Sequence, residues 1–418
     1  MKGKFELKID SDKDLLNKEA PCERILSLGV IAPELEQRVE RPALNLCLVI
    51  DRSGSMSGGK LEYARQAAAH AVQQLREGDQ IAVVAFDNNV EVVSPSLPAT
   101  AQNKHQVVSL IAGIREGGST NLSGGWLTGC QLIAAQQREG QVARAILLTD
   151  GQANVGITDA AELARHAREL NVRGISTSTF GIGDGFNEHL LEAMSNAGGG
   201  NFRYIATPEQ IPALFAEEMG QLGMIVLRKA SLEITVPFGY SFRVLGSYYN
   251  TVRGNVVTIT LNDMYAGGTE GIFMTALVHN QPEVSSVGVS VVLRGLGEND
   301  EAVEVKAEKI LTFASEIEEA AAPVNRVLLE AFVDVLLADL QAESLKMERR
   351  GLGREAAEKL RVLLERWGQY LPANRVLYYQ NLIQRMQRND LQEFERKALH
   401  QEQYTTKRTT IDRSFFDN

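Results

Sequence analysis

Cysteine is scarce in this sequence, and long apolar runs are missing from it. The 418 residues include 3 cysteines, an odd number with no CxxC spacing, so the sequence predicts neither a disulfide framework nor a cysteine-bound metal. A reducing compartment is therefore expected. The best apolar run, residues 43–50, is far too short to cross a bilayer, and the N-terminus shows no signal-peptide pattern. These absences predict a cytoplasmic protein without a membrane anchor.

Basic residues are outnumbered, and histidine is rare. The chain carries 43 Lys and Arg against 53 Asp and Glu, for a formal net charge of -10. This balance argues against a general nucleic-acid binder and is compatible with a cationic ligand or a bound metal. The 6 histidines form neither HExxH nor a short paired spacing, so no zinc site is expected. The remaining composition, 44% apolar and 23% charged, is that of a folded protein.

Hydrophobic patterns divide the chain into five segments. Residues 1–40 show the pattern of short strands. Residues 43–222 alternate apolar strands with amphipathic helices, which predicts a Rossmann-like, doubly wound and mostly parallel α/β sheet. Residues 228–313 alternate with a period of two, as in an antiparallel β-sandwich, and residues 316–400 return to a helical period. Residues 401–418 are predicted to be a polar tail, whose Phe415-Phe416 pair could dock.

Acidic and hydroxyl side chains follow the predicted buried strands of the α/β segment or open one of its helices. The residues concerned are Asp51, Ser53, Ser55, Thr120 and Asp150. Because ligands of an open parallel sheet bind beyond the carboxyl ends of its strands, we expect these side chains to meet. Two carboxylates and three hydroxyls suit Mg²⁺, a hard cation that prefers oxygen ligands.

The charge of this cluster favours binding over catalysis. Two carboxylates balance the charge of one divalent ion. If either carboxylate acts only through water, the ion stays electrophilic and keeps a coordination position that a carboxylate of another molecule can fill.

The order Asp51-x-Ser53-x-Ser55, followed by Thr120 and Asp150, resembles the metal-ion-dependent adhesion site (MIDAS) of von Willebrand factor type A (VWA) domains. The resemblance covers residues 43–222 and includes the segments 149–151 and 181–184. It implies that these residues hold Mg²⁺, with Mn²⁺ or Ca²⁺ as alternatives, either directly or through water. It also implies that an Asp or Glu of a partner protein completes the coordination shell.

The order of segments resembles bacterial relatives of inter-alpha-trypsin inhibitor heavy chains and calcium-activated chloride channel proteins. In some of these relatives the VWA domain is inserted into a sandwich, which implies that strands from residues 1–40 complete the sheets of residues 228–313. The resemblance implies a non-enzymatic, adhesion-like module for protein–protein interaction. We expect Arg52, Met56 and Asn121 to form the rim of its site.

Two glycine-rich segments suggest nucleotide binding more weakly. Gly54 and the Gly59-Lys60 pair match the spacing of a phosphate-binding loop. Leu61 stands where such a loop needs Ser or Thr, so Lys60 is expected to be a solvated residue in the first turn of a helix. Residues 181–185 follow a strand but lack the third glycine of a dinucleotide-binding turn, so a plain turn is expected there.

Two other functions are kept as alternatives. The chain could be an accessory subunit of a chelatase-type or other ATPase complex, because VWA domains occur in such assemblies. A Mg²⁺-dependent hydrolase is less favoured, because no general base and no GxSxG motif accompany Ser53. No nucleic-acid partner is expected.

Overall fold

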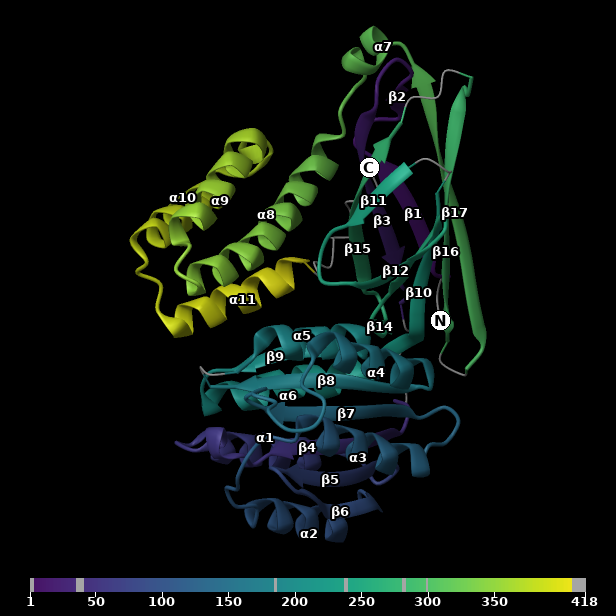
Figure 1. Cartoon of the computed structure of the whole chain (residues 1–418). Helices are drawn as coiled ribbons and strands as arrows, with labels where there is room; N and C mark the ends of the chain where they lie inside the picture. The colour runs from purple at the N-terminus through teal and green to yellow at the C-terminus, as the bar shows by residue number, and fades with distance from the viewer. Residues whose placement is uncertain are drawn as a thin grey trace.

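A computed structural model describes residues 4–34, 41–183, 186–236, 240–279, 283–297 and 300–407. Figure 1 shows an α/β layer, a β-sandwich that rises from it, and a group of helices beside the sandwich. Asp184, Gly185 and the Phe415-Phe416 pair lie outside the described residues. Among the helices of the described residues, none is both long and apolar enough to cross a membrane.

The α/β layer is built on a six-stranded sheet with the order β6-β5-β4-β7-β8-β9. Its strands are β4 (Leu44–Asp51), β5 (Gln80–Phe86), β6 (Val90–Pro98), β7 (Val142–Thr149), β8 (Ile175–Ile182) and β9 (Gly199–Ile205). Every residue of β4, β5, β7 and β8 is buried, because helices cover both faces of the sheet.

Two separate cores lie on the two faces of this sheet. Side chains of α1 (Lys60–Gln74), α2 (Ala101–Ala112) and α6 (Ile211–Leu222) pack on one face. Side chains of α3 (Leu122–Ala135), α4 (Ala160–Val172) and α5 (Glu188–Ala197) pack on the other. The predicted doubly wound, mostly parallel sheet is confirmed.

One edge strand departs from the parallel pattern. β6 pairs antiparallel with β5, because only residues 87–89 connect the two strands. A parallel pairing needs a crossover of a dozen or more residues.

The sandwich joins segments from before and after the α/β layer. Its sheets have the orders β1-β3-β15-β11 and β12-β13-β10-β16-β17-β2. β3 (Cys22–Ile31) pairs antiparallel with β15 (Thr269–Val278) along its full length, and β2 (Leu15–Asn17) pairs with the end of β17 (Ala302–Ala314). The chain therefore leaves the sandwich after β3 and returns to it through β10 (Ile225–Thr235).

Short strands complete these sheets. They are β1 (Glu6–Ser11), β11 (Tyr240–Val244), β12 (Tyr249–Arg253), β13 (Val256–Thr260) and β14 (Met264–Tyr265), beside the longer β16 (Ser286–Leu296). The sequence pattern did not predict β12, because this edge strand is partly or fully exposed along its length and has no buried face to produce apolar alternation.

The helical region packs on the sandwich and reaches back to the α/β layer. Its helices are α7 (Glu316–Ala321), α8 (Arg326–Arg349), α9 (Gly353–Trp367), α10 (Ala373–Arg388) and α11 (Glu393–Lys407). Phe332 of α8 meets Phe273 of the sandwich edge to face, with ring centroids 6.1 Å apart. α11 crosses above α5 (Figure 1), and Lys397 and His400 of α11 pair with Glu188 and Glu192 of α5.

Residues 401–407, predicted as part of a polar tail, belong to α11, which continues to Lys407. Lys397, His400 and Gln403 of this helix are each 2–3% exposed. Since this buried face of α11 is polar, apolar periodicity did not reveal it.

Candidate metal centre

Two buried carboxylates lie side by side at one edge of the α/β sheet. Asp51 ends β4, and Asp150 directly follows β7. Because β4 and β7 are parallel neighbours, their carboxyl ends share this edge. Both aspartates are 0% exposed.

A chain of polar contacts connects the two aspartates through the serine loop. Asp51 Oδ1 accepts a hydrogen bond from the Ser53 N–H at 2.8 Å. The Ser53 and Ser55 hydroxyl oxygens are 3.1 Å apart, and Ser55 Oγ donates to Asp150 Oδ1 at 3.0 Å. The structure therefore brings together four of the five predicted residues by side-chain contact.

The loop that carries Thr120 lies directly against the serine loop. The Gly54 N–H donates to Gly118 O at 2.8 Å. The Thr120 N–H donates to Asn154 Oδ1 at 2.8 Å, and Thr120 is 2% exposed. These contacts place Thr120 at the same edge as Asp51 and Asp150.

Asp87, which the sequence analysis missed, positions this threonine loop. It follows β5, and its Oδ2 accepts a hydrogen bond from the Gly118 N–H at 3.1 Å. A Cβ at Gly117 would lie 1.9 Å from Asp87 Oδ2, so only glycine fits there. Burial raises the pKa of Asp87, but hydrogen bonds from the Asn89 and Gly118 backbones and the Arg52 guanidinium lower it below its usual value. The position of Asp87, a carboxylate directly after a buried strand, was the sequence signal that could have revealed its role.

The electrostatics of the site call for a cation. Burial raises the pKa of Asp51 to about 6; hydrogen bonds from Ser53 and Thr149 oppose this shift, and the Asp150 charge adds to it. The negative charge of Asp150 makes ionisation of Asp51 more costly. A cation between them would remove this cost.

Lys60 supplies one positive charge at this position. Its Nζ lies 3.2 Å from Asp150 Oδ2 and donates to Ser55 O at 3.0 Å. Lys60 lies in the first turn of α1 as expected, but its side chain is only partly exposed and pairs with a buried carboxylate. α1 begins beside Asp150, and its first side chain turns into the cluster.

The donor set fits a hard divalent cation. One ammonium against two buried carboxylates leaves one negative charge without a partner among these residues. All candidate side-chain ligands are oxygen atoms, which is the preference of Mg²⁺, Mn²⁺ and Ca²⁺.

The three predicted rim residues have different positions. Arg52 is partly exposed and pairs with Glu91 at 2.5 Å. Asn121 caps α3, because its side chain accepts a hydrogen bond from the Gly124 N–H at 3.0 Å. The prediction for Met56 was wrong: it is 0% exposed and packs in the core beneath the site together with Leu61. A turn of 3₁₀ helix over Gly54–Met56 directs its apolar side chain inward.

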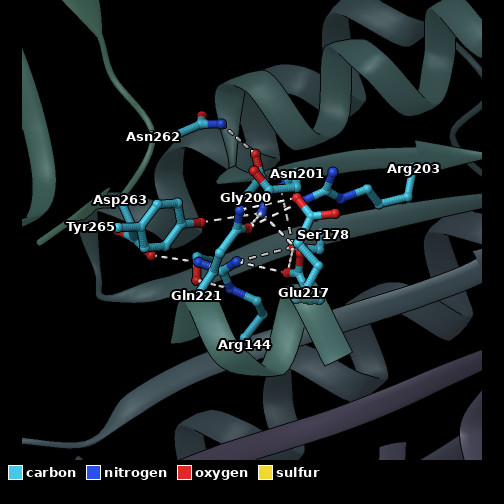
Figure 2. Close-up of polar contacts among 12 residues, drawn as sticks. Arg144, Ser178, Gly200, Asn201, Arg203, Glu217, Gln221, Asn262, Asp263 and Tyr265 are labelled. Carbon is cyan, nitrogen blue, oxygen red and sulfur yellow. Dashed lines mark hydrogen bonds and ion pairs between the residues drawn. The ribbon is translucent and has the colours of Figure 1, made fainter. Parts of the chain in front are cut away.

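A second buried cluster of charges lies near the opposite end of β7 (Figure 2). Arg144 of β7 donates to Glu218 of α6 at 2.9 Å and to Asp263 of the sandwich segment at 2.6 Å. It also donates to the hydroxyls of Ser176 and Ser178 at 2.9 and 3.1 Å. The cluster ties the α/β layer to the sandwich.

Comparison with known proteins identifies the α/β layer. The family model described as "von Willebrand factor type A domain" matches residues 45–217. The chain contains a von Willebrand factor type A domain. The predicted resemblance to this family is therefore confirmed.

Curated relatives share the VWA region. The chain is 30% identical to the uncharacterized protein YfbK of Escherichia coli over 226 residues, which cover 53% of this chain and 39% of that protein. It is 31% identical to human inter-alpha-trypsin inhibitor heavy chain H4 over 209 residues, which cover 49% of this chain and 22% of that protein. The chain thus spans well under two thirds of either relative.

The similarity to solved structures extends over nearly the whole chain. A von Willebrand factor type A protein from Catenulispora acidiphila superposes with a TM-score of 0.70 at 16% identity, covering 97% of each chain. The likeness shows that the arrangement of VWA domain, sandwich and helices is a shared fold.

Proposed function

We propose that the VWA domain binds a divalent cation, Mg²⁺ in the first instance, and through it an acidic side chain of a partner protein. VWA domains are typically protein-interaction modules, which fits this proposal. The observation that carries it is the excess of buried negative charge at the sheet edge. Asp51 and Asp150 are 0% exposed, and within the part of the chain that the structure describes, the ion pair of this cluster joins Lys60 to Asp150.

The hydrogen bonds suggest which residues would bind the cation directly and which would act through hydrogen bonds or water. Both Asp51 oxygens already accept hydrogen bonds, from the Ser53 N–H and the Thr149 hydroxyl. This arrangement suits a carboxylate that acts through hydrogen bonds or water. The hydroxyls of Ser53, Ser55 and Thr120 would then be direct ligands. Such neutral ligands leave the ion with much of its positive charge, which favours an incoming carboxylate.

The surface above the site is open to a partner. Ser55 is half-buried, and Gly54, Ser57, Gly58 and Gly59 are exposed around it. A partner carboxylate can therefore approach over the turn at residues 54–59. We propose that this contact is binding without catalysis.

Metal titration of the full chain tests the first step. Calorimetry should show Mg²⁺ binding to the wild type, and Thr120→Ala should weaken it by more than about tenfold. Ser57→Ala, which removes an exposed hydroxyl from the same turn, is the matched control and should bind as the wild type does. Equal Mg²⁺ affinity in Thr120→Ala would refute the proposed ligand set.

Capture from a lysate tests the second step. Wild-type bait should retain a partner in Mg²⁺ and lose it in excess chelator, whereas Thr120→Ala bait should retain nothing under either condition. Recovery that is equal in all conditions would show that the sandwich or the helices bind the partner without metal.

A further inference from the structure

Metal-ligating side chains from two regions of the chain meet where α11 crosses α5. His189 and Glu192 lie one turn apart on α5, and His400 comes from α11. One ligand atom from each of the three lies within 4.8 Å of the others. Residues three apart on a helix share a face, which directs His189 and Glu192 toward the same side.

The contacts within this cluster leave buried polar atoms unsatisfied. Glu192 Oε2 is 3.0 Å from His400 Nε2, but that nitrogen makes no geometrically acceptable hydrogen bond within the described residues. On the other side of the ring, Gln403 Nε2 is 2.7 Å from His400 Nδ1. Gln403 Oε1 is buried and also lacks a hydrogen bond there.

A turned-over Gln403 amide and a bound metal would together give both unsatisfied atoms a partner. If the Gln403 amide is turned over, the His400 Nδ1–H donates to Gln403 Oε1, and the Nε2 lone pair is free to bind a metal. Metal-binding histidines characteristically donate their second ring N–H to a carbonyl or carboxylate in this way.

We propose that His189, Glu192 and His400 bind a transition-metal ion, with Zn²⁺ as the best match. Two imidazoles and one carboxylate form a donor set that zinc takes readily with a fourth, exchangeable ligand. This set differs from the all-oxygen centre at Asp51 and Asp150, so the two centres would select different ions.

A cavity of about 310 Å³ adjoins the cluster and supplies room for the fourth ligand. His189 and Glu192 line it from the VWA domain, Tyr249 from the sandwich and Lys346 from the helical region. The positive charge of Lys346 favours an anionic fourth ligand, such as a carboxylate or chloride.

The ion would strengthen an interface that other charges already form. Lys397 of α11 lies 2.7 Å from Glu188 Oε2, and Arg349 of α8 pairs with the same carboxylate. A metal bound by α5 and α11 together would add a further bond between the VWA domain and the C-terminal helix.

Zinc titration of the full chain tests the proposal. The protein is stripped of metal, saturated with Mg²⁺ to fill the oxygen site, and titrated with Zn²⁺ by calorimetry. The wild type should bind one equivalent, and His400→Ala and Glu192→Gln should each lose more than about tenfold in affinity. His105→Ala, at an exposed position of α2, is the matched control and should bind as the wild type does.

Co²⁺ gives a readout that does not depend on the folding of a variant. Wild-type protein with Co²⁺ in place of Zn²⁺ should show the strong visible absorption bands that are typical of four-coordinate Co²⁺. Absence of these bands, absence of zinc binding by the wild type, or equal zinc affinity in His400→Ala would each overturn the proposal. Glu192 and His400 would then form an ordinary ion pair.

Discussion

Two buried clusters of charge lie at opposite ends of β7 and differ in how completely the protein balances them. At one end, Arg144 donates from all three of its side-chain nitrogens. Its carboxylate partners are also stabilised by a second positive charge each, Glu218 by that of Arg203 and Asp263 by that of Arg228. At the other end, the partly exposed ammonium of Lys60 pairs with Asp150, and among the described residues no ion pair is made by Asp51.

This difference supports the proposal that the aspartate cluster binds a cation and that the Arg144 cluster is structural. Buried charge is stable when it is paired and hydrogen-bonded, so the Arg144 cluster needs nothing from outside the protein. The aspartate cluster keeps an uncompensated charge, which a cation from solution can neutralise. Each cluster pairs one cation with two carboxylates, so the additional charges of Arg203 and Arg228 distinguish the Arg144 cluster from the aspartate cluster.

Removing the arginine should produce the largest effect and break the structural cluster. Arg144→Met leaves Glu218 and Asp263 buried without their shared partner, so we expect unfolding free energy to fall by about 3–5 kcal/mol. Urea denaturation measures this change. Arg173→Met, at an exposed position, should stay within about 0.5 kcal/mol of the wild type. If Arg144→Met unfolds at the same urea concentration as the wild type, the cluster contributes no stability.

Neutralising an aspartate should have the opposite effect: weaker Mg²⁺ binding with little change in the free energy of unfolding. Asp150→Asn should reduce Mg²⁺ affinity by more than about tenfold. The metal-free protein should keep its unfolding free energy to within about 1 kcal/mol, because one of two adjacent buried negative charges is gone. Calorimetry and urea denaturation measure the two quantities. If Asp150→Asn unfolds the metal-free protein as Arg144→Met does, the two ends of β7 do not differ in kind.

Removing the internal cation should sharpen the contrast. Lys60→Met deletes the ammonium that competes with the metal for Asp150. We expect Mg²⁺ affinity to rise about fivefold, equivalent to about 1 kcal/mol for unit charges about 4 Å apart in water. Lys306→Met, which removes a lysine that is 66% exposed, is the control. A fall in affinity would mean that Lys60 supports the metal rather than competes with it.

The smallest effect is expected beneath the metal site. Met56→Leu conserves apolar volume in the core and should cost less than about 1.5 kcal/mol of unfolding free energy. Mg²⁺ and partner binding should remain unchanged, because Met56 is 0% exposed. Partner capture in Mg²⁺ checks the second expectation. If Met56→Leu loses partner binding but keeps Mg²⁺ binding, Met56 contributes to the partner-binding surface after all.

Much of the VWA fold followed from the sequence, because local patterns encode it. The apolar run of β4 and the spacing of α1 reflect strands buried on both faces and helices buried on one. The antiparallel edge strand β6 had its own local signal, a connection too short for a crossover. Edge strand β12 has no such local signal in the sequence, because it has no buried face.

The candidate metal residues could be named in sequence order for a related reason. In a parallel sheet, residues that follow strands come together at one edge, so Asp51 and Asp150 had to be neighbours if β4 and β7 were. The position of Lys60 and the burial of Met56 were not predicted. Each depends on the direction in which a side chain leaves its turn, and the residue pattern does not contain that direction.

The sequence by itself determined the VWA fold and the order of its oxygen-bearing residues, since both depend on local periodicity and on strand ends. Only the tertiary structure decided which charges are balanced and which distant residues meet. Arg144 pairs with Asp263 because the segment between β13 and β14 returns to the α/β layer, where the Asp263 N–H donates to Gly199 O of β9. His400 pairs with Glu192 because α11 crosses over α5. Contacts of this kind depend on how whole elements pack, and no spacing along the chain records them.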